Sequence, residues 1–305
     1  MTVLIEKMAL MVILMALGYL CVRLKLVGPE FNKGLSKLVI NVFLAGMILS
    51  SVINKELEMS GSDIALGILL MTVSTLISIG IGWLSPGLLR IKDGDKGMYR
   101  MLVAFMNNGF VGFPLVAAFF GEDAVFFASL SNIPFNLLLY TVGIMFLQKG
   151  EKNYKFSIKN VINVPIIATL AAVVIFIFEI PMPKIVDDVA DTLSAATVPL
   201  SMMCVGMSLG DVSLKEAVSK PRMYGMSFMR LVVSPLIVWF VLRFFIADPI
   251  ILGTIVILAA CPSAVICTII GLQYGRDGVE SSEEIFISTI LSMITIPLLL
   301  YILGI

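Results

Sequence analysis

The sequence predicts an all-α integral membrane protein with ten transmembrane helices, arranged as a five-plus-five inverted repeat. Three observations lead to this prediction. Apolar residues make up 59% of the 305 residues and charged residues only 14%, whereas soluble domains carry about 25% charged residues. The apolar residues fall in runs of about 20, the length that crosses a bilayer as a helix. Lysine and arginine alternate between successive connections, as expected of loops on opposite sides of a membrane.

The composition also excludes several classes of function. The chain has no histidine, so histidine metal sites, histidine general bases and Ser-His or Cys-His dyads are ruled out. Lysine plus arginine and aspartate plus glutamate both number 21, and no basic patch is available for a nucleic acid. The four cysteines lie in apolar runs without C-x-x-C spacing, which predicts small buried side chains. We expect no enzyme activity, no metal site and no cofactor.

Ten apolar segments are each long enough to form a membrane span. The first segment lacks the basic leader and small-residue cleavage site of a signal peptide, so we count it as a span. The predicted spans cover residues 4–22, 35–53, 63–84, 100–120, 124–147, 161–180, 190–209, 224–246, 250–271 and 284–304.

The basic residues orient these spans. One side of the membrane receives 16 of the lysines and arginines, including the short basic link Lys149–Lys159, while the other side receives four and Arg230 lies inside the eighth span. Cationic loops stay in the cytoplasm. We therefore expect a multi-pass protein of the cell inner (plasma) membrane with both termini on the non-cytoplasmic side.

Two short matches indicate an internal repeat. Residues 137–144 and 298–305 are identical at six of eight positions, and residues 120–123 resemble residues 274–277 after the fourth and ninth spans. A five-span unit repeated in tandem must insert the second time with opposite topology, which is an architecture of secondary transporters. We expect a first repeat over residues 1–155 and an inverted second repeat over residues 156–305.

The fourth and ninth spans contain residues that disfavour a continuous helix. The fourth reads NNGFVGFP over residues 107–114, and the ninth reads ACPSA over residues 260–264. Interrupted backbone at membrane depth is tolerated only inside protein or beside a water-filled cavity, and the ends of half-helices can bind an anion. The alternative is a proline kink with small residues for close packing. The candidate substrate ligands in these segments are Asn107, Asn108, Gly109, Pro114, Pro262 and Ser263.

Three further polar residues lie inside predicted spans. Arg230 is a candidate for binding the substrate, although its long side chain could instead reach the inner surface. Asn132 and Asn136 are four residues apart and share a helix face, so they either line a cavity or join two helices by hydrogen bonds. No aspartate or glutamate falls in the middle of a predicted span, so a proton relay through a carboxylate is not expected.

One motif points to an activity that the rest of the chain cannot support. Residues 206–210 read GMSLG, which matches the G-x-S-x-G motif of serine hydrolases. That motif requires a strand-to-helix turn and a histidine, whereas this segment ends a membrane span. We expect these glycines to serve helix packing.

Motifs in three spans resemble those of the auxin efflux carrier family, whose bacterial members include malate and malonate carriers and whose relatives include the plant PIN proteins. Residues 107–115, NNGFVGFPL, are similar to the family pattern Asn-Thr-Gly-Phe-x-Gly-x-Pro-Leu. Residues 198–209 resemble the family's Pro-Leu…Gly-x-Ser-Leu stretch, and residues 262–275 resemble its Pro-x-Ala-Val…Tyr-Gly stretch. The likeness covers essentially the whole chain.

The resemblance implies a fold like that of bile-acid and sodium–proton transporters. Spans 1, 2, 6 and 7 would form a scaffold through which a homodimer assembles, and spans 3–5 and 8–10 a mobile transport unit in which spans 4 and 9 cross. The substrate carboxylate would lie at the crossing, by Asn107, Asn108 and Pro262. Asn108 stands where the family usually has threonine, and Ile266 where many bacterial members have asparagine, so the usual substrate is left open.

The sequence therefore predicts a secondary transporter of a small organic anion, such as malate, malonate or an auxin-like acid, that works by alternating access. Coupling to Na⁺ or H⁺ is left open. The alternatives are a sodium-coupled carrier of the bile-acid type on the same fold, a membrane-embedded enzyme, for which the chain offers no catalytic group, and a membrane sensor that binds a ligand without transport.

Overall fold

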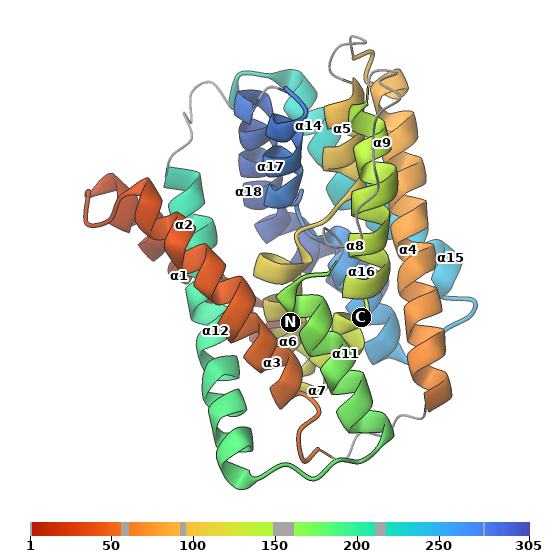
Figure 1. Cartoon of the computed structure of the whole chain (residues 1–305). Helices are drawn as coiled ribbons and strands as arrows, with labels where there is room; N and C mark the ends of the chain where they lie inside the picture. The colour runs from red at the N-terminus through yellow and green to blue at the C-terminus, as the bar shows by residue number, and fades with distance from the viewer. Residues whose placement is uncertain (1, 56–60, 92–95, 149–161, 211–217, 277) are drawn as a thin grey trace. The chain divides into compact units, whose positions relative to one another are not determined.

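The computed structural model describes residues 2–55, 61–91, 96–148, 162–210, 218–276 and 278–305. These residues are helical apart from connecting segments and an isolated β-bridge (Figure 1). Among them, six helices are long and apolar enough to cross a membrane, and there are also shorter apolar helices of 10–17 residues. The fold is that of an all-α multi-pass membrane protein, and the count of ten spans stays a prediction. The predicted repeat boundary and the basic link Lys149–Lys159 lie outside the described residues.

The helices pack into two compact units. Unit 1 comprises Met1–Leu69, Gly109–Ile133 and Ile162–Asp211, and unit 2 comprises Leu70–Asn108, Pro134–Val161 and Val212–Ile305. Each unit takes segments from both halves of the chain, so this division differs from that of the predicted repeats. Three helices contribute residues to both units: α4 (Gly61–Leu88), η2 (Asn108–Gly112) and α8 (Asn132–Leu138).

One helix of unit 1, α11 (Val164–Ile177), begins at residues that follow local capping rules. The side chain of Asn163 accepts a hydrogen bond from the Ile166 N–H at 3.1 Å, and a proline follows in the first turn of the helix. Both features favour a helix start at this point. The other helices of unit 1 are α1 (Thr2–Arg23), α2 (Pro29–Leu38), η1 (Val39–Phe43), α3 (Leu44–Ser50), α6 (Phe113–Phe120), α7 (Asp123–Ser129) and α12 (Lys184–Gly210).

Glycines allow α1 and α12 of unit 1 to approach closely. A Cβ atom added to Gly206 would lie 1.9 Å from the Met15 carbonyl oxygen, and one added to Gly18 would lie 2.2 Å from the Met203 carbonyl oxygen. Both distances are far below van der Waals contact, so only glycine fits at these positions. This backbone approach is the small-residue packing typical of membrane helices. The prediction that the GMSLG segment serves helix packing is confirmed.

Unit 2 contains the two helices that end at the predicted interruptions. The second of these begins where the Asp248 side chain accepts hydrogen bonds from the N–H groups of Ile250 and Ile251, with Pro249 as the first helical residue. The helices of unit 2, besides the shared ones, are α5 (Lys96–Ala104), η3 (Leu139–Gly143), α9 (Ile144–Leu147), α14 (Pro221–Phe228), η4 (Met229–Val233), α15 (Ser234–Leu242), α16 (Pro249–Ala260), α17 (Val265–Gln273) and α18 (Gly278–Leu303).

Two short helices form the core of unit 2. Residues 101–105, at the end of α5 and just beyond it, are all fully buried. Every residue of α16 from Ile255 to Ala260 is at most 1% exposed. A helix that is apolar on every side belongs in the interior of a protein. The last turns of α5 and of α16 therefore lie in the interior of unit 2.

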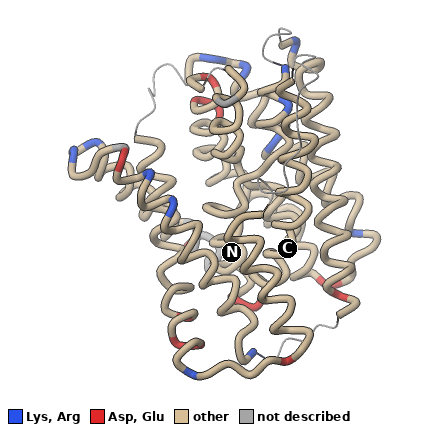
Figure 2. The backbone as a smooth tube through the Cα atoms, viewed as in Figure 1, with Lys and Arg blue, Asp and Glu red and all other residues tan. Residues whose placement is uncertain are grey.

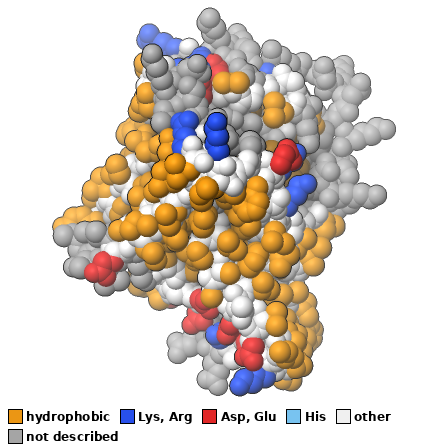
Figure 3. Space-filling model, turned by 90° about the vertical axis from the view of Figure 1, so that its left-hand side faces the viewer, with side chains coloured by type: hydrophobic (Ala, Val, Ile, Leu, Met, Phe, Trp, Pro, Cys, Tyr) orange, Lys and Arg blue, Asp and Glu red, His pale blue; other side chains and the backbone are white. Residues whose placement is uncertain are grey.

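The surface of each unit fits a lipid environment. Most charged residues lie toward the ends of helices (Figure 2), and the face shown in Figure 3 carries a broad hydrophobic area. On α1, for example, Leu10, Ile13, Leu17 and Leu20 repeat at helical spacing and are each between 46% and 57% exposed. Such a stripe is unfavourable in water but suits contact with acyl chains.

Two helices begin earlier than the sequence predicts. α12 begins at Lys184 rather than at residue 190, and α18 begins at Gly278 rather than at residue 284. In both cases acidic residues end the apolar run but do not end the helix, because other polar groups in the same unit contact them. Asp187 of α12, for instance, accepts a hydrogen bond from the Asn54 amide at 3.2 Å.

Candidate functional site

In unit 2, two helices are interrupted and their extended segments pair with each other. α5 ends at Ala104 and α16 at Ala260, and the backbone that follows each of them is not helical. The Asn107 N–H donates to the Pro262 carbonyl at 2.8 Å, and the Ala264 N–H donates to the Phe105 carbonyl at 3.1 Å. These bonds form a short antiparallel bridge, which we call the crossover (residues 105–107 and 261–264).

The composition of the second segment explains its extended conformation. Pro262 has no N–H to continue the helix, and a proline disfavours the helical conformation in the residue before it. Cys261 accordingly has φ −63° and ψ 150°, and Ala264 has φ −76° and ψ 131°. The lost helical hydrogen bonds are replaced by the bonds between the two segments, as buried backbone requires.

Ser263 attaches the crossover to the neighbouring helices of unit 2. Its hydroxyl donates to the Leu102 carbonyl of α5 at 2.7 Å, and its N–H donates to the Ser288 hydroxyl of α18 at 3.3 Å. Ser263 is fully buried. The predicted ligand Ser263 therefore holds three elements of unit 2 together.

Arg230 binds the ends of both interrupted helices. Its side chain is fully buried in η4. It donates to the carbonyls of Val103 at 2.9 Å, Ala259 at 2.6 Å and Cys261 at 3.0 Å. These carbonyls end α5 and α16, where the helix dipoles concentrate partial negative charge. The guanidinium group thus satisfies the open carbonyls and offsets their negative potential.

The beginning of α17 adds N–H groups to the same region. By helix geometry the first N–H groups of α17, those of Val265 and Ile266, have no acceptor within the helix. The Cys267 N–H is bonded to the Ala264 carbonyl at 3.0 Å. The crossover therefore combines a buried cation with the positive end of a helix, an arrangement that attracts anions.

The predicted ligands fall into two groups. Asn107, Asn108, Pro262, Ser263 and Arg230 all belong to unit 2 and lie at or next to the crossover, and both asparagines are buried. Gly109, Pro114 and Asn132 belong to unit 1, and Asn136 to unit 2. The Asn132 amide donates to the Thr169 hydroxyl at 3.2 Å, so it joins α8 to α11, which is one of its two predicted roles.

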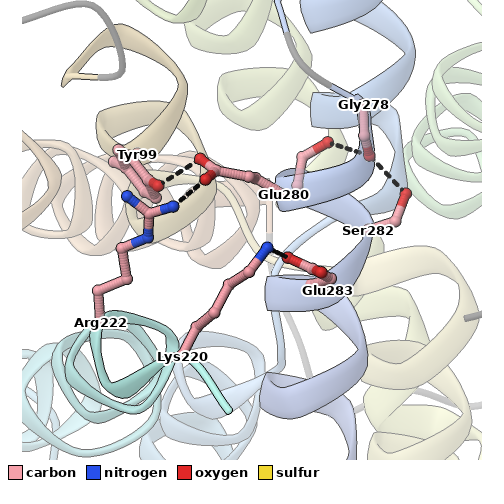
Figure 4. A network of polar contacts seen from close by, with 8 residues as sticks. Tyr99, Lys220, Arg222, Gly278, Glu280, Ser282 and Glu283 are labelled. Carbon is pink, nitrogen blue, oxygen red and sulfur yellow. Dashed lines mark hydrogen bonds and ion pairs between the residues drawn. The ribbon is translucent and has the colours of Figure 1, made fainter. Parts of the chain in front are cut away.

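A polar network braces one end of unit 2 (Figure 4). The Tyr99 hydroxyl of α5 donates to Glu280 of α18 at 2.6 Å, and Arg222 of α14 forms an ion pair with the same carboxylate. Lys220 pairs with Glu283 at 2.5 Å. These contacts join α5, α14 and α18, which also pack against one another. The brace holds the ends of these helices together.

Sequence reasoning missed the buried carboxylates of Glu283 and Glu284. Glu284 is fully buried in α18, one helical turn before Ser288. The predicted span 284–304 begins at this residue, so Glu284 does not fall in the middle of a predicted span. The four-residue spacing of Glu280, Glu284 and Ser288 places all three on one face of a helix and could have revealed the site. Among the described residues, no group of histidine, cysteine, aspartate and glutamate could hold a metal ion.

The chain is similar to known membrane transporters over nearly its full length. The model of a family described as "Membrane transport protein" matches residues 3–300. An "Uncharacterized transporter" of Methanothermobacter thermautotrophicus is 27% identical over 96% of both chains, and one of Methanocaldococcus jannaschii is 26% identical over 96% of both. A "Putative malonate transporter" of Rhizobium meliloti is 27% identical over 94% of this chain and 92% of its own. These proteins are named as transporters, not enzymes.

Proposed function

We propose that this chain, which belongs to the membrane transport protein family indicated by its auxin efflux carrier motifs, carries a small carboxylate across the membrane by alternating access. The crossover is the observation that carries the proposal. A dicarboxylate of the size of malonate or malate is the substrate that its charge and burial favour.

The electrostatics of the crossover support an anionic substrate. An anion beside the carbonyl ends of α5 and α16 would normally be repelled, but Arg230 donates to carbonyls of both ends. A carboxylate at this position would be held by charge-assisted hydrogen bonds from the first N–H groups of α17 and from the amides of Asn107 and Asn108. Pro262 and Ser263 would fix the backbone that presents these donors.

The similarity to a "Putative malonate transporter" supports the same substrate class. Malonate carries two carboxylates on one carbon, so a single buried cation leaves one charge to be balanced. We infer that the N-terminal dipole of α17, which is worth up to about half an elementary charge, offsets part of the remaining charge.

Alternating access requires a body that moves as a unit. We propose that unit 2 moves in an elevator or rocking motion and carries the crossover with it. The brace of Tyr99, Arg222 and Glu280 and the bonds of Ser263 support this role, because they connect helices that must keep their arrangement during the movement. The proposal retains the expected homodimer and the expected orientation with cytoplasmic basic loops.

The test is uptake of radiolabelled malonate into proteoliposomes that contain the purified protein. Asn107→Ala removes an amide at the crossover and should abolish uptake while the protein remains folded and monodisperse. Asn41→Ala is the matched control, because Asn41 is exposed and its amide donates to a nearby backbone carbonyl, that of Lys37 one turn earlier. Equal uptake by the wild type and Asn107→Ala would contradict the site. Uptake that requires a sodium gradient would favour a sodium-coupled carrier of the bile-acid type.

A further inference from the structure

A buried carboxyl group lies beside the crossover and has no role in the site described above. Glu284 is completely buried in α18, inside a helix long enough to cross a membrane. One turn later on the same helix, Ser288 accepts a hydrogen bond from the N–H of Ser263 in the crossover. Glu284 is therefore separated from the candidate anion site by about one helical turn.

The carboxyl group has only hydroxyl groups as direct partners, and no cation bonds to it among the described residues. Its Oε2 atom has no hydrogen-bond donor among the described residues, and its Oε1 atom is 3.5 Å from the Ser227 hydroxyl, at the long limit for a hydrogen bond. The hydroxyls of Ser263 and Ser288 lie nearby. However, they donate to the carbonyls of Leu102 and Ile285, respectively.

The charged groups around Glu284 are committed to other contacts. Arg230 is three residues after Ser227, yet three of its N–H groups point to carbonyls. The acidic neighbours on α18 have their own cations, since Glu280 pairs with Arg222 and Glu283 with Lys220. The other titratable group close to Glu284 is the thiol of Cys267, which is buried.

A buried carboxylate without a paired cation is strongly unfavourable, and binding a cation removes the penalty. The nearby oxygens are a carboxyl and three hydroxyls. A proton is the cation that fits such a site, because it binds one carboxyl oxygen and needs no set of coordinating ligands, whereas a metal ion needs several oxygens directed at one point.

We propose that Glu284 is the site of a coupling proton, so that the protein moves the anion together with H⁺. This inference rests on the proposed function. With the proton bound, Glu284 is neutral and does not repel an anion at the crossover. Without the proton, the Glu284 carboxylate adds a negative charge about one helical turn from the crossover and repels the anion. Proton and anion therefore favour each other's binding, which is positive coupling between two sites.

The proposed cycle conserves charge and atoms. On one side of the membrane, Glu284 takes up one proton and the crossover takes up one dianion. Both leave on the other side, the O–H bond of Glu284 breaking as water accepts the proton. Each cycle then moves one net negative charge. Transport therefore depends on the pH gradient, which acts on the proton, and on the membrane potential, which acts on the net charge.

The experiment compares the wild type with Glu284→Gln in proteoliposomes. The substitution keeps the shape of the protonated acid but cannot release a proton. Two assays are run: accumulation of radiolabelled malonate driven by a pH gradient, and exchange of external labelled malonate for internal unlabelled malonate without a gradient. We expect gradient-driven accumulation to be at least tenfold lower in the variant than in the wild type. The rate of exchange should stay within about twofold of the wild-type rate. Glu283→Gln is the matched control, because Glu283 is adjacent and buried but paired with Lys220, and it should retain gradient-driven accumulation.

The outcomes separate the two proposals. If the wild type performs neither exchange nor accumulation, the malonate function fails. If the wild type performs exchange, but the pH gradient has no effect or the variant accumulates malonate as the wild type does, the role of Glu284 fails while the function stands. Accumulation driven by a sodium gradient and lost in Glu284→Gln would assign the site to Na⁺ and overturn the proton.

A second measurement does not depend on transport. Infrared difference spectra of the purified wild type, recorded with and without malonate, should show a change in the carbonyl band of a protonated carboxyl group. We expect this signal to be absent in Glu284→Gln and present in Glu283→Gln. An identical band in all three proteins would contradict the assignment, even if the Glu284→Gln variant proved unstable in the transport assay.

Discussion

Replacing Arg230 by methionine should strongly destabilise unit 2. The guanidinium group donates to the carbonyls of Val103, Ala259 and Cys261. Each bond from a charged donor contributes about 1.5–3 kcal/mol. Methionine fills a similar apolar volume but leaves three buried carbonyls without donors, each at a penalty of about 1–3 kcal/mol. The substitution also removes the unfavourable burial of the positive charge, which offsets part of this loss. We therefore expect the free energy of unfolding to fall by about 3–5 kcal/mol, the range for breaking one side of a buried charged contact.

The assay is unfolding of the purified protein in detergent micelles, followed by helical circular dichroism against denaturant. Arg243→Met is the matched control, since Arg243 is exposed and its guanidinium lies over the rings of Trp239, Phe240 and Phe244. The control should lose about 1 kcal/mol or less. Arg230→Lys should fall between the two, because one ammonium group cannot reach three divergent carbonyls. If Arg230→Met lost no more stability than Arg243→Met, Arg230 would not hold the ends of the interrupted helices.

Two further predictions test the packing of each unit. Gly206→Leu in unit 1 should prevent normal folding or expression, because even a Cβ atom there would lie 1.9 Å from the Met15 carbonyl oxygen. The control Gly80→Leu should express like the wild type, because no atom lies within 4 Å of a Cβ added at Gly80. Equal yields of the two variants would contradict the close approach. Tyr99→Phe in unit 2 should lower the free energy of unfolding by about 1–3 kcal/mol, because the hydroxyl donates to the Glu280 carboxylate at 2.6 Å. An unchanged denaturation midpoint would show that the brace contributes little.

The interruptions could be located from the sequence because the residues that cause them act locally. Pro262 cannot continue a helix, and the asparagines and glycines after residue 106 are poor helix formers. Likewise, the glycines of α12 indicated close packing at Gly206, and the structure confirms that interpretation. Local propensity and the requirement to satisfy buried backbone were sufficient for these features.

The partners of Arg230 could not be predicted in the same way. Its three carbonyl acceptors lie at positions 103, 259 and 261, and carbonyls are present at every residue, so no sequence pattern marks them. Glu284 was missed for a different reason. Three glutamates at positions 280, 283 and 284 lower the local hydropathy and moved the predicted start of the span. The helix nevertheless continues because Arg222 and Lys220 pair with the first two carboxylates.

The most direct test of the anion site is a cryo-electron microscopy map of the protein saturated with malonate, compared with a map of the protein without ligand. We expect ligand density beside Asn107 and the first turn of α17, with Arg230 still bonded to the ends of α5 and α16. Malonate density at a different place, with the crossover unchanged between the two maps, would contradict the account.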